Sequence, residues 1–367
     1  MAAENIKVQP LNKVYSRYVW QTNSNEDFTE DMTLFTLQAK NTTYAFAALE
    51  SGLLAHVYFG QKVEDDDLSY LLALDRNPWT LKVNARDAGT VMDSTPFEYP
   101  CHGTGDYREP CLMVMDNAGM STCDLRYVSH KVYGGKPKIE TADGFIPATF
   151  ADENEASTLE ITCVDKVSGL EATLIYTAFK DLDVITRSVR LKNNGSESIN
   201  IRRVLSACVD FESSDYDFIT LNGSWARERA IERSHLHHGK QGEEFAAPEV
   251  VMVHSSNGIG EMSRTFHDLY RQHLIRGEYK DKRRPILINN WEATYFNFNT
   301  EKLIDIAKQA SKLGIEMLVM DDGWFGHRDS DNSSLGDWFV YEKKIDGGLK
   351  HLVDEVNKLG MKFGIWF

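Results

Sequence analysis

Residues 30–255 alternate apolar and polar side chains with a period of two, the pattern of half-buried β-strands. The alternating stretches are rich in Thr, Val, Ile and aromatic residues, and Gly, Asn and Asp interrupt them. Val167-Ser168-Gly169 indicates a tight connection, and Lys192-Asn193-Asn194-Gly195 indicates a hairpin. Many strands with few helical stretches predict a large antiparallel sandwich.

The period lengthens to that of a helix after the sandwich. Apolar residues at Met262, Phe266 and Leu269 have helical spacing, and Gly277 can end the helix. We interpret this segment as a linker helix between two domains. The predicted division of the chain is therefore a sandwich at 1–258, a linker helix at 259–280 and a second domain at 281–367.

Short apolar strands alternate with amphipathic helices in the second domain. A strand is expected at 286–288, and Thr300 is expected to cap a helix that Gly314 stops. The sequence KLGIEM recurs as KLGMKF at an offset of 360 − 314 = 46 residues, each copy being a helix end, a glycine and a buried strand. This alternation predicts a parallel sheet, and the single repeat only modestly favours a barrel over an open sheet. In both folds ligands bind at the C-terminal ends of the strands, where Asp321 and Trp366 occupy nearly equivalent positions.

Composition and charge narrow the class of protein. The chain has 367 residues, more than one ordinary core needs, and Lys+Arg 40 against Asp+Glu 55 gives a net charge of −15. This charge argues against nucleic acid and anionic membranes as partners. The first twenty residues lack a secretory pattern and no apolar run is long enough to span a membrane, so we expect a cytoplasmic protein. The five cysteines show no CxxC spacing and are expected to be reduced structural thiols, with no metal site.

The stretch LVMDDGWFG (318–326) carries the candidate chemistry. Asp-Asp-Gly is most often a solvated turn, but here it directly follows a buried strand. Aromatic residues occur after three successive strands: Trp291 and Tyr295, then Trp324 and Phe325, then Trp366. Carboxylates accept hydrogen bonds from vicinal hydroxyls and indole faces cover the C–H surface of a sugar ring, so the arrangement favours a sugar site. Core packing is the alternative for each tryptophan taken singly.

The two aspartates are poorly placed to be the acid and nucleophile of a glycosidase. That chemistry needs two carboxylates roughly 5–9 Å apart on opposite sides of the bond, whereas neighbouring residues point in divergent directions. We expect Asp321 and Asp322 to grip adjacent hydroxyls instead. His235, His237 and His238 lack a carboxylate or cysteine pattern nearby and are expected to form a polar loop.

These residues resemble the bacterial α-galactosidases of glycoside hydrolase family 36. The segments that carry the likeness run in order through nearly the whole chain and are specific: YPCHGTGDYREPCL (99–112), DLRYVSHKVYGGKPKI (124–139), DLDVITRSVR (181–190), WARERAIERSHL (225–236), APEVVMVHSSNGIGEMSRTFH (247–267), NNWEATYFNF (289–298), LVMDDGWFG and FGIWF.

The resemblance implies a fold, an activity and a set of binding residues. The fold would be an N-terminal antiparallel β-supersandwich followed by the first three strands of an incomplete (β/α)8 TIM barrel. The activity would be retaining, metal-free hydrolysis of terminal α-galactosyl groups in melibiose and raffinose-type sugars, without a cofactor and often in a homotetramer. Asp321 and Asp322 would bind the galactose hydroxyls at O4 and O6, and Trp291 and Trp366 would line the galactose pocket.

The sequence departs from the family pattern in two places. The nucleophilic and acid/base aspartates of the family lie in strands with no counterpart before Phe367, so we expect a fragment that is inactive alone. Residues 241–245 join two places that are well separated in the family, which indicates an internal deletion near 241–242. A transglycosylase relative and a non-catalytic galactoside-binding remnant remain the alternative functions.

Overall fold

The chain folds into two compact units, Met1–Ile275 and Arg276–Phe367. The computed structural model describes residues 3–12, 15–16, 31–74, 90–103, 105–141, 144–211, 213, 215–224, 226–235 and 249–367. The predicted deletion at 241–242, together with His237 and His238, lies outside these residues. The domain boundaries at 258 and 280 stay predictions.

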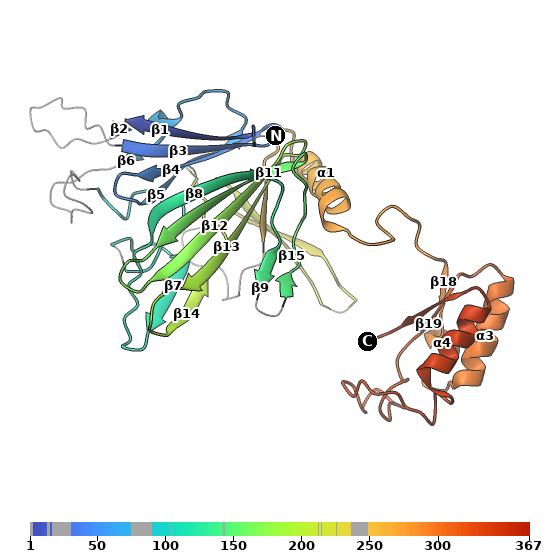
Figure 1. Ribbon diagram of the computed structural model, residues 1–367. Helices are drawn as coiled ribbons and strands as arrows, with labels where there is room; N and C mark the ends of the chain where they lie inside the picture. Colours follow the sequence, from blue (N-terminus) through green and yellow to red (C-terminus); the bar gives the residue numbers. More distant parts are fainter. Residues whose placement is uncertain are drawn as a thin grey trace, which may run out of the picture. The chain divides into compact units, whose positions relative to one another are not determined.

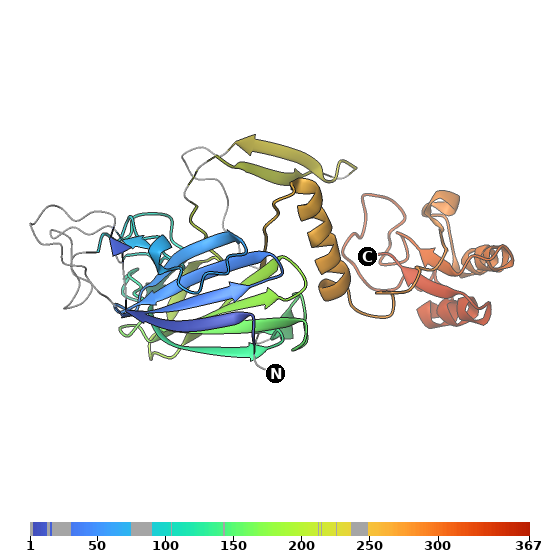
Figure 2. The ribbon, with the colours of Figure 1, turned by 90° about the horizontal axis from the view of Figure 1, so that it is seen from above.

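Two antiparallel sheets face each other in the first unit (Figures 1 and 2). The first sheet has the order β1-β3-β4-β5, with β1 (Ile6–Asn12), β3 (Asp31–Gln38), β4 (Thr42–Leu49) and β5 (Leu54–Gln61). The second has the order β17-β13-β12-β11-β8, with β17 (Val250–Val253), β13 (Val184–Asn193), β12 (Leu170–Phe179), β11 (Ala156–Val164) and β8 (Arg126–Gly134).

Shorter elements complete the first unit. The paired strands are β2 (Tyr15–Ser16) with β6 (Ala73–Leu74), β7 (Leu112–Asp116) with β14 (Ile199–Val204), β9 (Ile139–Thr141) with β10 (Gly144–Ile146), and β15 (Asp217–Asn222) with β16 (Ala230–His235). A 3-10 turn covers Ser69–Leu71, and α1 (Ile259–Leu269) continues into a π-helical turn, Tyr270–Leu274. The segment predicted as a linker helix therefore packs within the first unit.

Aromatic residues form the core between the two sheets. Phe46 on β4 stacks on Tyr176 on β12 with ring centroids 4.8 Å apart, and both are fully buried. Burying such rings removes a large apolar area from water, at roughly 25 cal/mol per Å². The alternating pattern predicted in the sequence is thus used on both inner faces of a sandwich.

A buried ion pair crosses the same core. Arg187 on β13 lies 3.0 Å from the Glu98 carboxylate, and both side chains are at most 1% exposed. Glu98 also accepts hydrogen bonds from Tyr44 and Tyr176 at 2.6 and 2.9 Å, and its other oxygen lies 3.1 Å from His56. Burial alone would raise the pKa of Glu98, but Arg187 and the hydrogen-bonding partners outweigh it and the pKa is lowered.

One of the two predicted turns joins paired strands and the other does not. The connection at Val167-Ser168-Gly169 joins β11 to β12, as predicted. The Asn193-Asn194-Gly195 turn is present, with the Gly195 amide bonded to Asn193 Oδ1 at 2.9 Å, but β14 leaves it to pair with β7. The hairpin prediction is wrong: β13 pairs with β12 and, over Val184–Arg187, with β17, while β14 pairs with β7.

The second unit alternates strands and helices. Its parallel sheet has the order β18-β19-β20, and the elements are β18 (Leu287–Asn289), α2 (Trp291–Thr294), α3 (Thr300–Lys312), β19 (Met317–Met320), α4 (Gly348–Lys358) and β20 (Lys362–Ile365). Helices α3 and α4 lie side by side along one face of the sheet (Figure 1). They bury the apolar stripes predicted from the sequence, including Leu303, Leu352 and Val356. The predicted fold class, a β-sandwich followed by the opening strands of an incomplete barrel, is confirmed.

The start of α3 differs from the prediction. Asn299 is the capping residue, because its side-chain oxygen accepts the Lys302 amide at 3.0 Å. Thr300 is the first helical residue, and its hydroxyl donates to the Asp346 carbonyl at 2.9 Å. Asparagine and threonine are both favourable capping residues, so the sequence alone does not decide between Asn299 and Thr300. The hydrogen bond between the Thr300 hydroxyl and Asp346 decides which of them caps the helix.

Candidate functional site

The candidate residues meet where the three parallel strands end. Met320 is paired with Ile365, so Asp321 and Trp366 come next on neighbouring strands. The Trp366 amide donates to the Met320 carbonyl at 2.9 Å, and the Asp321 amide donates to the side chain of Asn290 at 2.8 Å. The register of the sheet therefore places Asp321 and Trp366 at one edge, where the sequence predicted them.

Asp321 is held by neutral groups. Its Oδ2 accepts a hydrogen bond from the Asn289 amide group, and its Oδ1 accepts the backbone amide of Asp322 at 2.7 Å. The side-chain oxygen of Asn289, Oδ1, in turn accepts a hydrogen bond from the Trp291 backbone amide at 2.8 Å. One asparagine thus links the first aspartate to the first candidate tryptophan. Each carboxylate oxygen can still accept a further hydrogen bond from a ligand.

Asp322 is held by a cation. The Nε of Arg328 donates to Asp322 Oδ1 at 2.6 Å, and both residues are buried. This hydrogen bond raises the pKa of Arg328, because it favours the charged guanidinium. Among the described residues, Asp322 Oδ2 has no hydrogen-bonding partner. Two adjacent carboxylates of the sequence therefore have different electrostatic surroundings.

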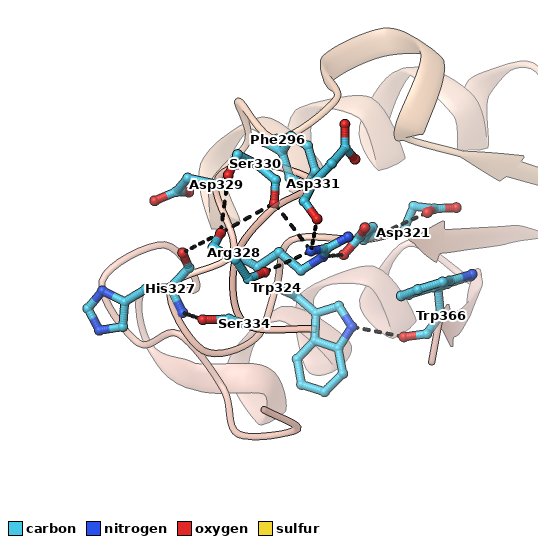
Figure 3. A network of polar contacts seen from close by, with 12 residues as sticks. Phe296, Asp321, Trp324, His327, Arg328, Asp329, Ser330, Asp331, Ser334 and Trp366 are labelled. Carbon is cyan, nitrogen blue, oxygen red and sulfur yellow. Dashed lines mark hydrogen bonds and ion pairs between the residues drawn. The ribbon is translucent and has the colours of Figure 1, made fainter. Parts of the chain in front are cut away.

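Arg328 also organises the loop that follows the strand. We call residues 326–339 the rim loop; a bridge between Phe325 and Val340 closes its base. The second guanidinium nitrogen, Nη1, donates to three rim-loop carbonyls: Ser330 at 3.2 Å, Asp331 at 3.2 Å and Ser333 at 2.7 Å (Figure 3). The loop carbonyls thus receive donors that a solvent-exposed loop would take from water.

Gly323 makes room for this arrangement. Its φ of 98° lies in the region that favours glycine, and a Cβ there would approach Phe296 Cδ1 to 2.9 Å. The glycine of the DDGW sequence therefore lets the chain turn from the strand end toward the rim loop.

Aromatic side chains surround the second aspartate and Trp366. Trp324 and Phe325 are buried and belong to the core, as the alternative interpretation of single aromatics stated. The Trp324 indole donates to the Trp366 carbonyl at 2.9 Å (Figure 3). Trp366 remains 37% exposed, and the rim-loop residue Trp338, which is 46% exposed, lies 6.2 Å away between ring centroids. An exposed indole pair thus stands at the strand ends.

Trp291 sits beside a strained turn. The turn runs from Thr294 to Asn297 and is closed by a 2.9 Å backbone hydrogen bond. Tyr295 adopts φ 45° and ψ −131°, the first central position of a type II′ turn, where glycine is usual. The Tyr295 ring meets Trp291 edge-on with centroids 5.4 Å apart, and Phe296 meets it at 4.9 Å.

The geometry suits the binding of a polyol better than acid–base chemistry. Asp321 and Asp322 leave one strand end in sequence, and one of them is engaged by Arg328. Glycoside cleavage requires two carboxylates on opposite sides of the scissile bond, whereas neighbouring residues of an extended chain point in divergent directions. Hydrogen-bond acceptors beside exposed indole faces are the groups that recognise a sugar.

Three residues of this site were not predicted from the sequence: Asn289, Arg328 and Trp338. Asn289 could have been predicted from the sequence, because it lies at the end of the first parallel strand just as Asp321 lies directly after the second. Arg328 and Trp338 could not, since their places depend on how the rim loop closes. Among the described residues, no group of three or more His, Cys, Asp or Glu side chains is arranged to hold a metal ion.

Comparison with known proteins identifies the family. The description "Glycosyl hydrolase family 36 N-terminal domain" matches residues 52–247, more than half of the chain, and "Melibiase" matches residues 244–367. The chain belongs to glycosyl hydrolase family 36. The two matched ranges overlap at residues 244–247, just before β17.

Family 36 relatives are similar along most of this chain. The α-galactosidase AgaA of Geobacillus stearothermophilus is 40% identical over 90% of this chain and 55% of its own length. The crystal structure of AgaB from the same organism matches with a TM-score of 0.79 and 40% identity, covering 91% of this chain and 55% of that one. An AgaA variant solved in complex with raffinose matches with a TM-score of 0.80 and 38% identity, covering 91% and 56%.

The chain spans about half the length of the relatives it matches. Within the part that the structure describes, no helix has both the length and the apolar character needed to cross a lipid bilayer.

Proposed function

We propose that this chain supplies the galactose-recognising part of an α-galactosidase-type retaining hydrolase. The observation that carries the proposal is the cluster of Asp321, Asp322 and Trp366 at adjoining strand ends, with Trp291 linked to it through Asn289. The relatives named as α-galactosidases, one of them solved with raffinose, support terminal α-galactosyl groups of melibiose and raffinose-type sugars as the substrate class.

The proposed roles follow from the partners of each residue. Asp321 and Asp322 would accept hydrogen bonds from the galactose hydroxyls at O4 and O6, Asp322 through the oxygen that Arg328 does not occupy. Trp291 and Trp366 would cover the apolar C–H surface of the ring. Galactose and glucose differ in the direction of the O4 hydroxyl. Acceptors placed for O4 and O6 beside an apolar ring face would therefore distinguish the two sugars.

Bond cleavage is proposed to need carboxylates other than this pair. Retention requires a nucleophile and an acid/base on opposite sides of the glycosidic bond, about 5–5.5 Å apart. We therefore propose that the 367-residue chain binds a galactoside but does not hydrolyse it by itself. Turnover of an aryl α-galactoside by the purified chain, with no other polypeptide present, would contradict this part of the proposal.

Galactose titration tests the binding proposal. We expect a saturable change in tryptophan fluorescence with galactose and a weaker one with glucose, because Trp291 and Trp366 contact the sugar. Asp321→Asn should raise the Kd at least tenfold through the loss of a charged acceptor, since hydrogen bonds to charged groups contribute about 1.5–3 kcal/mol. Asp305→Asn, on the exposed face of α3, is the matched control and should leave the Kd unchanged.

Asp321 is the better position to test than Asp322. Removing the Asp322 carboxylate leaves the buried guanidinium of Arg328 without its counter-ion, so lost binding would be mixed with lost structure. A wild-type chain without saturable galactose binding would refute the proposed function. Light scattering of the same preparation tests the further expectation of a homo-oligomer.

A further inference from the structure

Arg328 makes contacts of two kinds. Its Nε donates to Asp322 at the end of β19, while its Nη1 donates to the carbonyls of Ser330, Asp331 and Ser333 in the rim loop. The side chain is only 6% exposed. A single planar guanidinium therefore joins the Asp322 carboxylate to the backbone of the loop.

The surroundings leave the guanidinium few other positions. The Phe296 and Phe325 rings lie 5.6 and 5.9 Å from its central carbon, a distance typical of cation–π contacts. The Arg328 carbonyl accepts a hydrogen bond from Lys344 at 3.3 Å, and Lys344 also pairs with Asp329 at 2.6 Å. Backbone and side chain of Arg328 are thus both fixed.

The fork of an arginine is what this position requires. Arginine presents several N–H donors in one plane, so that one side chain can serve a carboxylate and several carbonyls at fixed relative angles. A lysine ammonium keeps the charge and can reach one of the two groups. The hydrogen bonds from Nη1 to the three carbonyls help to position Asp322 only if the loop and the carboxylate are held together.

We propose that Arg328 is a positioning residue that fixes the Asp322 carboxylate with Oδ2 toward the ligand and couples it to the conformation of the rim loop. The role of Asp322 toward a galactoside rests on the proposed function, but the coupling of Asp322 to the loop does not. Coupling between two sites is reciprocal. A ligand bound at Asp322 therefore stabilises the rim loop, and a loosened loop lowers the affinity for the ligand.

Hydrogen exchange in the sugar-free chain tests the coupling itself. Arg328→Lys and Asp322→Asn should each speed amide exchange in the rim loop at least tenfold, while α3 and α4 keep their protection. The double variant should exchange no faster than the faster single variant, because both changes break the same link. Arg283→Lys, an exposed arginine paired with Glu316 in the same unit, is the matched control and should exchange like the wild type.

Unchanged loop exchange in Arg328→Lys, or effects that multiply in the double variant, would overturn the coupling. Loss of protection in α3 and α4 would mean that a variant has unfolded, and the wild-type chain then decides. In the wild-type chain the Nε–H of Arg328 should exchange slowly with solvent, so that its ¹⁵N NMR signal remains visible at neutral pH. A fast-exchanging signal would contradict the proposal.

Sugar binding tests the positioning role. Arg328→Lys should raise the galactose Kd at least tenfold, and millimolar methylguanidinium should restore binding to Arg328→Ala by entering the vacated space beside Asp322. Unchanged affinity in Arg328→Lys would refute the positioning role. Absence of binding in the wild type would refute the proposed function instead, and the exchange experiment would still decide the coupling.

Discussion

Asp321 and Asp322 are neighbours with different partners. Asp321 is bonded to the amide of Asn289 and the backbone, whereas Asp322 forms a buried ion pair with Arg328. A buried pair is costly to break from either side, because the remaining charge is left without a counter-ion. Substitutions of the two aspartates consequently measure different quantities: ligand contact at Asp321, and ligand contact together with local structure at Asp322.

Tyr295 provides a prediction at the same scale. Its backbone conformation costs roughly 1–3 kcal/mol in a residue with a Cβ, and glycine avoids this cost while losing about 0.5–1 kcal/mol through its freedom in the unfolded chain. Tyr295→Gly should therefore leave the second unit more stable than Tyr295→Ala by about 1 kcal/mol. Urea unfolding of the two variants checks this, and equal midpoints would show that the turn is not strained.

The residues at the strand ends were predictable where a repeat specifies them. The 46-residue repeat puts Asp321 and Trp366 at nearly equivalent positions, and the sheet pairs Met320 with Ile365, an offset one residue shorter than that of the repeat. The partner of Asp322 was not predictable, since Arg328 reaches it only after the rim loop closes on the Phe325–Val340 bridge. Contacts set by a regular sheet can be derived from periodicity, whereas contacts set by an irregular loop cannot.

Elements of the second unit end and begin at residues with specific hydrogen bonds. Helix α3 begins after Asn299, which caps it, while the neighbouring Thr300 is used to hold the chain at Asp346. The hairpin predicted after β13 is also absent, because the turn forms but the next strand, β14, pairs with β7. At this scale the sequence predicts that an element exists better than it predicts its partner.

Asn299 gives the prediction at the scale of the helix. Asn299→Ala should lower the free energy of unfolding of the second unit by about 1 kcal/mol, because the Lys302 amide loses its acceptor. Asn299→Ser keeps an acceptor and should lie within a few tenths of a kcal/mol of the wild type. Denaturant unfolding followed by helical circular dichroism distinguishes the two, and equal losses would assign the effect to something other than capping.

The first unit depends on a charge pair placed between its sheets. Glu98 and Arg187 are buried with two tyrosines and a histidine. Breaking this network should therefore cost more stability than breaking an ion pair on the surface. Nothing in the alternating pattern distinguishes these positions from solvent-facing ones, so the sequence predicted the sandwich without its polar centre.

Acid should weaken the first unit through Glu98. Its pKa is lowered in the folded chain, so its stabilising contribution is complete above the ordinary value of 4.5 and is lost as the pH falls through the lowered pKa. Glu98→Gln should cost about 3–5 kcal/mol at neutral pH by leaving Arg187 unpaired, and should flatten the stability profile below pH 4.5.

Denaturant unfolding of the first unit at neutral pH and in acid checks the Glu98 prediction. Glu197→Gln, an exposed residue of the same unit, is the control and should follow the wild type at both pH values. A Glu98→Gln variant with the acid sensitivity of the wild type would show that other carboxyl groups govern the profile.

The indole rings of the second unit also form a set of coupled chromophores. Trp338 lies 6.4 Å from Trp324 and 6.2 Å from Trp366 between ring centroids, close enough for their electronic transitions to mix. Mixed transitions produce paired bands of opposite sign in near-ultraviolet circular dichroism, whose size depends on the mutual orientation of the rings. The position of the rim loop can therefore be followed optically in the unlabelled chain, with Trp338→Phe as the variant that removes the signal.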